Sequence, residues 1–222
     1  MNRFYILTFI IISLLNISLP SFARTQGVFT NTGIGGRSSV FGESFVAIAD
    51  DASAIYWNPA GISKLTNRYN LTASYINLFS GFTGISDINY NFFSFVFSDY
   101  PWGGGISSDF LGANTIIKSN MVGTIESLHS SYAEVKISPS ISSQLWKLGS
   151  VGISGNYFRI QTETPSNDLG ITLGYLSHKW IIMSDEKYEC WLRFGAAARN
   201  AFDTIDSPTS RYTIASTFGG GF

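Results

Sequence analysis

The sequence has few charged residues and only one cysteine. Lys, Arg, Asp and Glu make up 13% of the 222 residues, whereas a soluble globular domain usually has about 25%. The formal net charge is -1, so the chain lacks the basic surface that nucleic acids require, and we expect no nucleic-acid partner. Cys190 is the single cysteine. It cannot form an internal disulfide, and it has no cysteine companion for a structural zinc site.

Histidine is equally scarce, which argues against hydrolytic chemistry. The sequence contains His129 and His178, and neither has an evident serine partner at strand spacing. A Ser-His pair is what an outer-membrane phospholipase would need. The adjacent carboxylates Asp50 and Asp51 project in different directions and are not followed by further oxygen ligands at metal-binding spacing. We therefore expect no enzyme, no metal site and no cofactor.

Long apolar runs are also lacking. The longest, residues 4–15, is shorter than the roughly 20 residues that a membrane-spanning helix needs. It follows Arg3 and precedes Ser21 and Ala23, small residues at the positions that a signal peptidase reads. The sequence therefore predicts a signal peptide over residues 1–23 and export from the cytoplasm. Export leaves a soluble β-sandwich or a membrane protein built from strands as alternatives.

Alternating apolar and polar residues are abundant after residue 67. Between residues 133 and 145 the apolar face repeats at every second position, while Glu134 and Lys136 lie on the polar face. A tilted strand of about 9 to 11 residues crosses a bilayer, whereas a strand in a soluble sandwich usually ends after about 5 or 6. The length therefore favours a membrane strand. In a membrane strand the polar face turns to the lumen, so Glu134 and Lys136 are candidates for lining it.

The same period recurs along the chain and predicts about eight strands. They are expected at residues 68–79, 88–98, 102–112, 131–146, 149–161, 168–182, 188–200 and 209–222. In the seventh, Arg193 and Arg199 oppose the apolar positions and are further lumen candidates.

Two details qualify this strand pattern. The apolar phase slips between residues 88 and 97, which indicates a bulge or a strand that is apolar on both faces. Short connections at 99–103, 147–150 and 184–187 contrast with a long polar connection at 114–131. Short turns at one end and long loops at the other are typical of an outer-membrane barrel.

A stretch rich in Gly, Ala and Ser precedes the strands, at residues 33–63. Its glycines match neither the dinucleotide-binding nor the phosphate-loop pattern, so nucleotide binding is not expected. Asp50 or Asp51 is predicted to cap a short helix over residues 52–57. Pro59, directly after Asn58, is predicted to begin a further helical turn.

The sequence FVAIADDASAIYWNPAGIS, residues 45–63, resembles the N-terminal hatch of the FadL-type long-chain fatty-acid outer-membrane transporters and of the related PorV/PorQ-like proteins. A weaker resemblance to the PorV-like group lies at residues 168–175 and 195–200. The resemblance implies an all-β fold, a transmembrane antiparallel β-barrel of fourteen strands whose lumen is blocked by the hatch. It further implies that the hatch residues include Asp50, Asp51, Asn58, Pro59 and Ala60.

These features give a division into a signal peptide (1–23), a hatch (24–67) and barrel strands (68–222). An eight-stranded barrel is filled by its own side chains and has no room for a hatch. We therefore expect the chain to cover only part of a fourteen-stranded barrel.

The resemblance implies a protein of the cell outer membrane, with membrane lipid as one partner. Its expected function is passive passage of hydrophobic small molecules such as long-chain fatty acids, without a cofactor. The alternative is a PorV-like barrel that binds secreted proteins in a secretion or surface-attachment machinery.

Overall fold

The computed structural model describes residues 34–78, 88–113, 116–119, 125–128, 132–161, 165–184, 189–201, 205–206, 211–212 and 217–221. The predicted signal peptide lies outside these residues. The described chain is mostly antiparallel β-sheet, which confirms the all-β prediction at that level.

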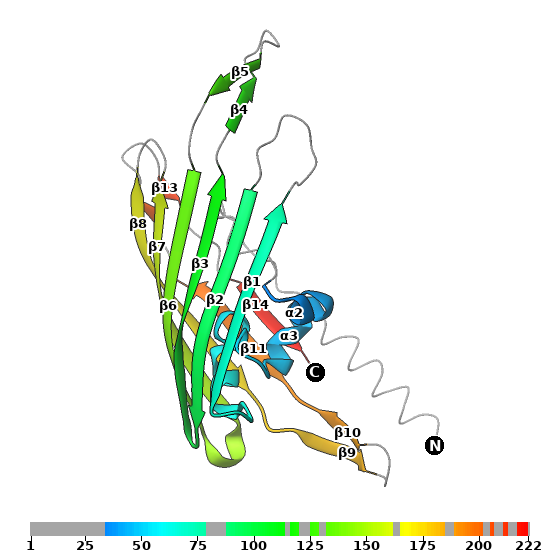
Figure 1. Ribbon diagram of the computed structural model, residues 1–222. Coiled ribbons are helices and arrows are strands. Elements are labelled where there is room, and N and C mark those ends of the chain that lie inside the picture. Colours follow the sequence, from blue (N-terminus) through cyan, green and yellow to red (C-terminus); the bar gives the residue numbers. More distant parts are fainter. Residues whose placement is uncertain are drawn as a thin grey trace.

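Eight strands form the main sheet, in the order β1-β2-β3-β6-β7-β8-β11-β14. Every neighbouring pair is antiparallel, and Figure 1 shows the long strands side by side. The strands are β1 Tyr69–Leu78, β2 Ile88–Asp99, β3 Trp102–Ala113, β6 Tyr132–Gln144, β7 Ser150–Gln161, β8 Ser166–Leu176, β11 Gly195–Ala201 and β14 Thr217–Gly221. Within the described residues the sheet does not close, because β1 and β14 are its two edges.

Six shorter strands form three separate two-stranded sheets. They are β4 Ile116–Ser119 with β5 Ile125–Leu128, β9 Trp180–Ser184 with β10 Glu189–Leu192, and β12 Ile205–Asp206 with β13 Arg211–Tyr212. The first pair lies inside residues 114–131, where the sequence suggested only a polar connection.

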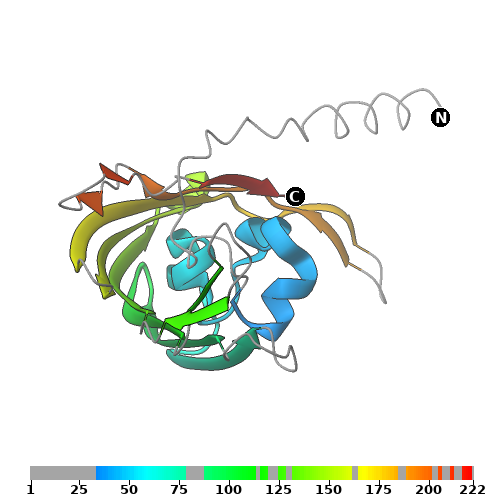
Figure 2. The same cartoon turned by 90° about the horizontal axis from the view of Figure 1, so that it is seen from above.

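The sheet curls around residues 34–65, here called the helical segment (Figure 2). This segment contains α2 Gly36–Phe41, η2 Gly42–Ser44, α3 Phe45–Ile48, α4 Ala54–Trp57 and η3 Pro59–Lys64. Nearly all of its apolar side chains after Ser44 are buried, and they form the core together with Tyr90, Phe92 and Val96 of β2. The core therefore lies between the helical segment and the concave face of the sheet.

Strand β2 resolves the slip in apolar phase between residues 88 and 97. Its pairing with β1 and with β3 runs without a shift in register. Tyr90 and Phe92 point inward and are buried, while Phe93 and Phe95 point outward and are exposed. The strand is apolar on both faces because one face packs on the helical segment, and the bulge considered as the other explanation is absent from β2.

Three predicted strands are each divided. Residues 168–182 divide between β8 and β9, residues 188–200 between β10 and β11, and residues 209–222 between β13 and β14. The first two breaks lie side by side and are joined by hydrogen bonds: Ser177 N donates to Phe194 O (2.8 Å), and Phe194 N donates to Ser177 Oγ (2.8 Å). Beyond this point β9 and β10 turn away from the main sheet (Figure 1).

No helix among the residues described is long and apolar enough to cross a membrane.

Candidate functional site

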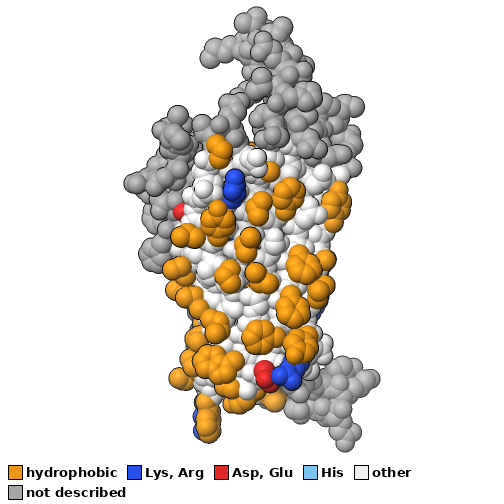
Figure 3. Space-filling view, turned by 60° about the vertical axis from the view of Figure 1, so that its left-hand side comes forward, with side chains coloured by type: hydrophobic (Ala, Val, Ile, Leu, Met, Phe, Trp, Pro, Cys, Tyr) orange, Lys and Arg blue, Asp and Glu red, His pale blue; other side chains and the backbone are white. Residues whose placement is uncertain are grey.

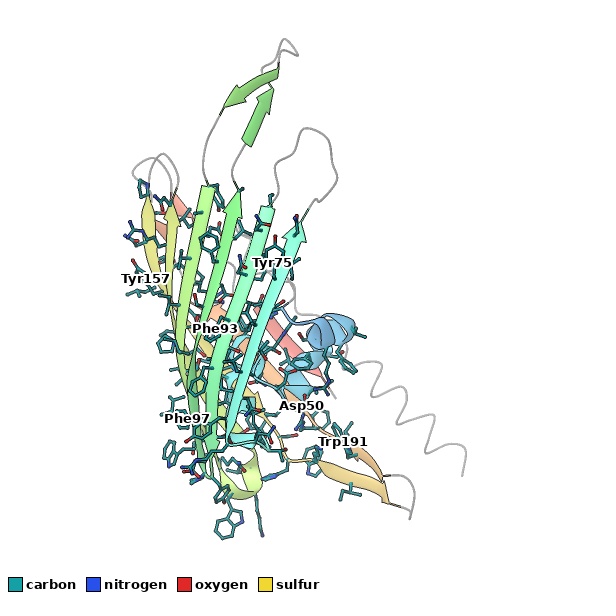
Figure 4. All side chains as sticks on the ribbon, viewed as in Figure 1. Asp50, Tyr75, Phe93, Phe97, Tyr157 and Trp191 are labelled. Carbon is teal, nitrogen blue, oxygen red and sulfur yellow. The ribbon has the colours of Figure 1, made fainter. Side chains whose placement is uncertain are left out.

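The convex side of the main sheet, here called the outer face, is apolar. Figure 3 shows hydrophobic side chains spread over this side, with few charged side chains, near its ends. Exposed large side chains on it include Tyr69, Leu71, Tyr75, Phe93, Phe95, Phe97, Ile106, Phe110, Ile137, Ile141, Val151, Ile153, Leu169, Ile171, Leu173 and Tyr175. Figure 4 labels four outward-pointing aromatic residues on three of the strands, Tyr75, Phe93, Phe97 and Tyr157.

The concave side carries charges that are almost completely buried. Asp109, Glu134, Lys136 and Arg199, here called the buried charge cluster, are each no more than 6% exposed. Lys136 Nζ lies 3.2 Å from Asp109 Oδ2, and Tyr90 OH donates to Asp109 Oδ1 (2.5 Å). Buried charges cost several kcal/mol each unless they are paired. Removing one partner of the Lys136 and Asp109 pair therefore leaves a costly charge behind.

The cations of this cluster also hold the helical segment. The Tyr56 ring contacts two cations, Lys136, whose Nζ is 4.8 Å from the ring centroid, and Arg199, whose Cζ is 5.5 Å away. Arg199 also lies 5.0 Å from the Trp57 ring. A desolvated cation–π contact contributes about 2 kcal/mol. Since Lys136 belongs to β6 and Arg199 to β11, Tyr56 links two distant strands across the inside of the sheet.

Asn58 fixes the next turn of the helical segment to the sheet. This side chain is fully buried, and its Nδ2 donates to Val46 O (2.8 Å) and to Tyr175 O on β8 (2.9 Å). Its Oδ1 accepts from Ala60 N (3.1 Å) and so caps η3, in which Pro59 occupies the first turn. The predicted helical start at Pro59 is confirmed. Asn58 also joins the helical segment to the wall.

Four inward-facing glycines bring strand backbone against the helical segment. They are Gly103 on β3, Gly152 on β7, Gly174 on β8 and Gly195 on β11. A Cβ atom at Gly152 would lie 2.4 Å from Ala60 N, and one at Gly174 would lie 2.2 Å from Asn58 Oδ1. No side chain fits at these distances. The helical segment therefore rests directly on the backbone of the sheet.

Two cations join the helical segment to the ends of β8 and β11. Arg193 Nε donates to Ala47 O (2.6 Å) and its Nη2 donates to Ile48 O, both at the end of α3. Lys64 Nζ donates to Ser177 O (2.6 Å) and to Leu176 O (3.4 Å). Burial, reinforced by the charges of Arg193 and Lys179, lowers the pKa of Lys64 to about 8. Burial likewise lowers the pKa of Arg193.

The two aspartates occupy different positions. Asp50 forms an exposed, two-pronged ion pair with Arg37 of α2, with Nη1 to Oδ1 at 2.6 Å and Nη2 to Oδ2 at 3.1 Å. Figure 4 places Asp50 beside these helices. Asp51 Oδ1 accepts from Ser53 N (2.8 Å), just before α4. The predicted cap is wrong for both aspartates, because the N-cap of α4 is Ser53 and no side chain makes a capping hydrogen bond there; the helix begins at Ala54 rather than Ala52.

The structure thus gives the sequence candidates distinct surroundings. Glu134, Lys136 and Arg199 lie on the inner face, whereas Arg193 lies between β10 and β11 against α3. Sequence reasoning missed Asp109 and Tyr56. Asp109 was detectable in principle, because it occupies an inward position of β3 and stands directly opposite Lys136 in the strand register. In the part of the chain described here, no three His, Cys, Asp or Glu side chains gather where they could hold a metal ion.

Comparison with protein families found no family model that matches the chain, and comparison with curated proteins found no match.

Proposed function

We propose that this chain is an outer-membrane β-barrel protein that lets hydrophobic small molecules, such as long-chain fatty acids, cross passively. The observation that carries the proposal is the two-sided sheet, whose outer face is apolar while its inner face holds charges and the helical segment. A bilayer-spanning strand wall needs this arrangement, with the apolar side toward lipid.

Strand length supports the membrane assignment. The six strands from β1 to β8 in the main sheet have 10 to 13 residues each, and a tilted strand crosses a bilayer in about 9 to 11. In lipid, the unpaired backbone groups at β1 and β14 would each cost several kcal/mol. Pairing of both edges in a closed barrel removes that cost.

In this proposal the helical segment is the hatch. It lies inside the curled sheet, where Phe45, Tyr56 and Trp57 form a buried cluster of aromatic rings. An apolar molecule would pass beside these rings after the segment shifts, driven by its own concentration gradient. The buried charge cluster opposes passage in the resting state, because an apolar molecule cannot satisfy it.

Uptake of a labelled long-chain fatty acid tests this function. Cells that carry the gene should accumulate the label faster than cells from which it is deleted, and a copy of the gene should restore the rate. Equal uptake in all three strains would overturn the transport proposal.

A PorV-like role is a second candidate, favoured by how tightly the helical segment fits. Backbone contacts at Gly103, Gly152, Gly174 and Gly195 leave it little room to shift, and a permanently closed barrel would act through its loops. In that case exported proteins should co-purify with the chain from detergent-solubilised membranes. A fatty-acid channel should bring down none.

A further inference from the structure

The hairpin of β9 and β10 stands apart from the rest of the wall. It forms its own two-stranded sheet, and Figures 1 and 2 show it extending away from the curled main sheet. An isolated two-stranded hairpin is at best marginally stable in water. The hairpin is therefore expected to pack its apolar side chains against another surface.

One face of this hairpin continues the outer face of the main sheet. Trp180 is 53% exposed and meets Phe194 edge to face, with ring centroids 5.2 Å apart. Phe194 leads directly into β11, where Ala196 points outward. If the outer face contacts lipid, Trp180 and Phe194 extend that contact onto the hairpin.

The other face combines apolar and cationic side chains. Ile181, 61% exposed, stands opposite Trp191 in the register. The Trp191 ring lies 4.3 Å from Lys179 Nζ and 5.4 Å from Arg193 Cζ, and Figure 4 shows Trp191 on this projecting arm. Lys64 is close enough that these two cations contribute to lowering its pKa. Arg193 is buried against α3, whereas Lys179 is exposed. Tryptophan beside an exposed lysine is typical of the region where lipid headgroups meet acyl chains.

The sequence between β9 and β10 bears on how deep the hairpin can lie. Asp185, Glu186 and Lys187 stand between the two strands in the sequence, and charged residues are expensive in hydrocarbon. Three charged residues at this place in the sequence favour the membrane surface over the membrane interior.

We propose that the β9 and β10 hairpin lies along the bilayer surface as a phospholipid-binding arm, with Trp180 and Phe194 toward the acyl chains and Lys179 toward lipid phosphates. This inference rests on the proposed membrane location and adds a specific lipid contact outside the wall. The hairpin lies toward the end of the main sheet opposite β4 and β5 (Figure 1).

Site-directed fluorescence on the full chain in vesicles tests this arm. Cys190 is replaced by Ser, and a bimane label is placed either at Ile181→Cys on the hairpin or at Leu173→Cys on the outer face of β8. The vesicles contain phosphatidylethanolamine and phosphatidylglycerol, with bromine near the headgroup or deep in the acyl chains, and iodide serves as the aqueous quencher.

The proposed arm predicts that bromine near the headgroup quenches the label at 181 more strongly than bromine deep in the acyl chains or iodide does. The label at 173 should be quenched by bromine and protected from iodide. Quenching of the label at 181 by iodide alone would overturn the proposed arm, as would shielding of that label from both quenchers by a bound protein. In either case the membrane proposal stands if bromine still quenches the label at 173. Iodide quenching at both positions overturns the membrane proposal itself.

The cationic contact has its own variant. Lys179→Gln should reduce shallow-bromine quenching at 181 in vesicles that contain phosphatidylglycerol. Lys147→Gln, an exposed lysine in the turn before β7, is the matched control and should leave it unchanged. An equal response to both variants would contradict a phosphate contact at Lys179.

Discussion

At the scale of single residues, Asn58 illustrates how one side chain can join two parts of the molecule. Its amide donates to Val46 O within the helical segment and to Tyr175 O on β8, and its carbonyl caps η3. All three partners are backbone groups, and two of the three hydrogen bonds are buried. Loss of the Asn58 amide therefore leaves several backbone groups without this hydrogen-bond partner at once.

Replacing Asn58 with Ala should lower the free energy of unfolding by about 2 to 4 kcal/mol, because each buried group left unpaired costs about 1 to 3 kcal/mol. Denaturant titration in detergent measures this. Asn70→Ala is the control, since Asn70 Nδ2 makes one exposed bond to Asn67 O (2.8 Å), and it should change stability by less than about 0.5 kcal/mol. Similar losses for both variants would count against the joining role of Asn58.

Lys64 gives a pH dependence whose sign follows from its surroundings. Burial and nearby cations lower its pKa in the folded chain from 10.5 to about 8. Between these two values the unfolded chain holds the proton and the folded chain has released it. Stability contributed by this residue therefore rises as the pH increases from about 8 to about 10.5, and is lowest and constant below pH 8.

The unfolding free energy of the wild type should therefore rise relative to that of Lys64→Met over this interval. Paired denaturant titrations at pH 7, 8, 9 and 10 measure the difference, and groups common to both proteins cancel. Curves that stay parallel from pH 7 to 10 would show that the pKa of Lys64 is not lowered.

At the scale of elements, the contact between the helical segment and the strands depends on glycines. Gly174→Ala would place a Cβ atom 2.2 Å from Asn58 Oδ1 and 2.9 Å from Pro59 Cδ. We expect a loss of about 1 to 3 kcal/mol, typical of overpacking, together with displacement of η3. Gly155→Ala on β7 is the matched control, because a Cβ atom there meets nothing within 4 Å.

Denaturant titration measures the stability of both variants, and hydrogen exchange across residues 54–64 reports displacement of η3. Gly174→Ala should raise the hydrogen-exchange rates of these residues, whereas Gly155→Ala should leave them unchanged. If Gly174→Ala exchanges and unfolds like Gly155→Ala, the segment does not rest on the strand backbone.

Period-two patterns predicted most of the long strands closely. The expected strand at 131–146 corresponds to β6 Tyr132–Gln144, and the one at 68–79 to β1 Tyr69–Leu78. The breaks after β8 and before β11 were not predictable, because they depend on hydrogen bonds between Ser177 and Phe194. The same holds for the contact between Tyr56 and Arg199, since no local pattern links residues so far apart in sequence.

At the scale of the whole molecule, the sheet separates two environments. Its inner face holds the buried charge cluster and the helical segment, and its outer face carries Phe, Ile, Leu and Tyr with almost no charge. In water, a face of this kind is an interaction surface or an aggregation hazard. In a bilayer, it matches the hydrocarbon.

If the outer face contacts lipid, as proposed, a lysine on it should cost stability according to its depth in the membrane. Ile171→Lys, in the middle of β8, should lower the unfolding free energy in vesicles by about 2 to 4 kcal/mol, and Leu148→Lys, in the turn before β7, by about 0 to 1 kcal/mol. Folding titrations in lipid vesicles measure both. In a water-exposed sheet the two substitutions would have similarly small effects.

The most direct test of the central claim, that the outer face contacts lipid, is a scan of lipid accessibility along β8. Single cysteines in a Cys190→Ser background carry a fluorescent label at successive positions from 168 to 175, in vesicles with brominated acyl chains. The claim predicts strong quenching at 169, 171, 173 and 175 and weak quenching at 168, 170, 172 and 174, because alternate residues face opposite sides. Uniformly weak bromine quenching, with iodide quenching the odd positions instead, would contradict it.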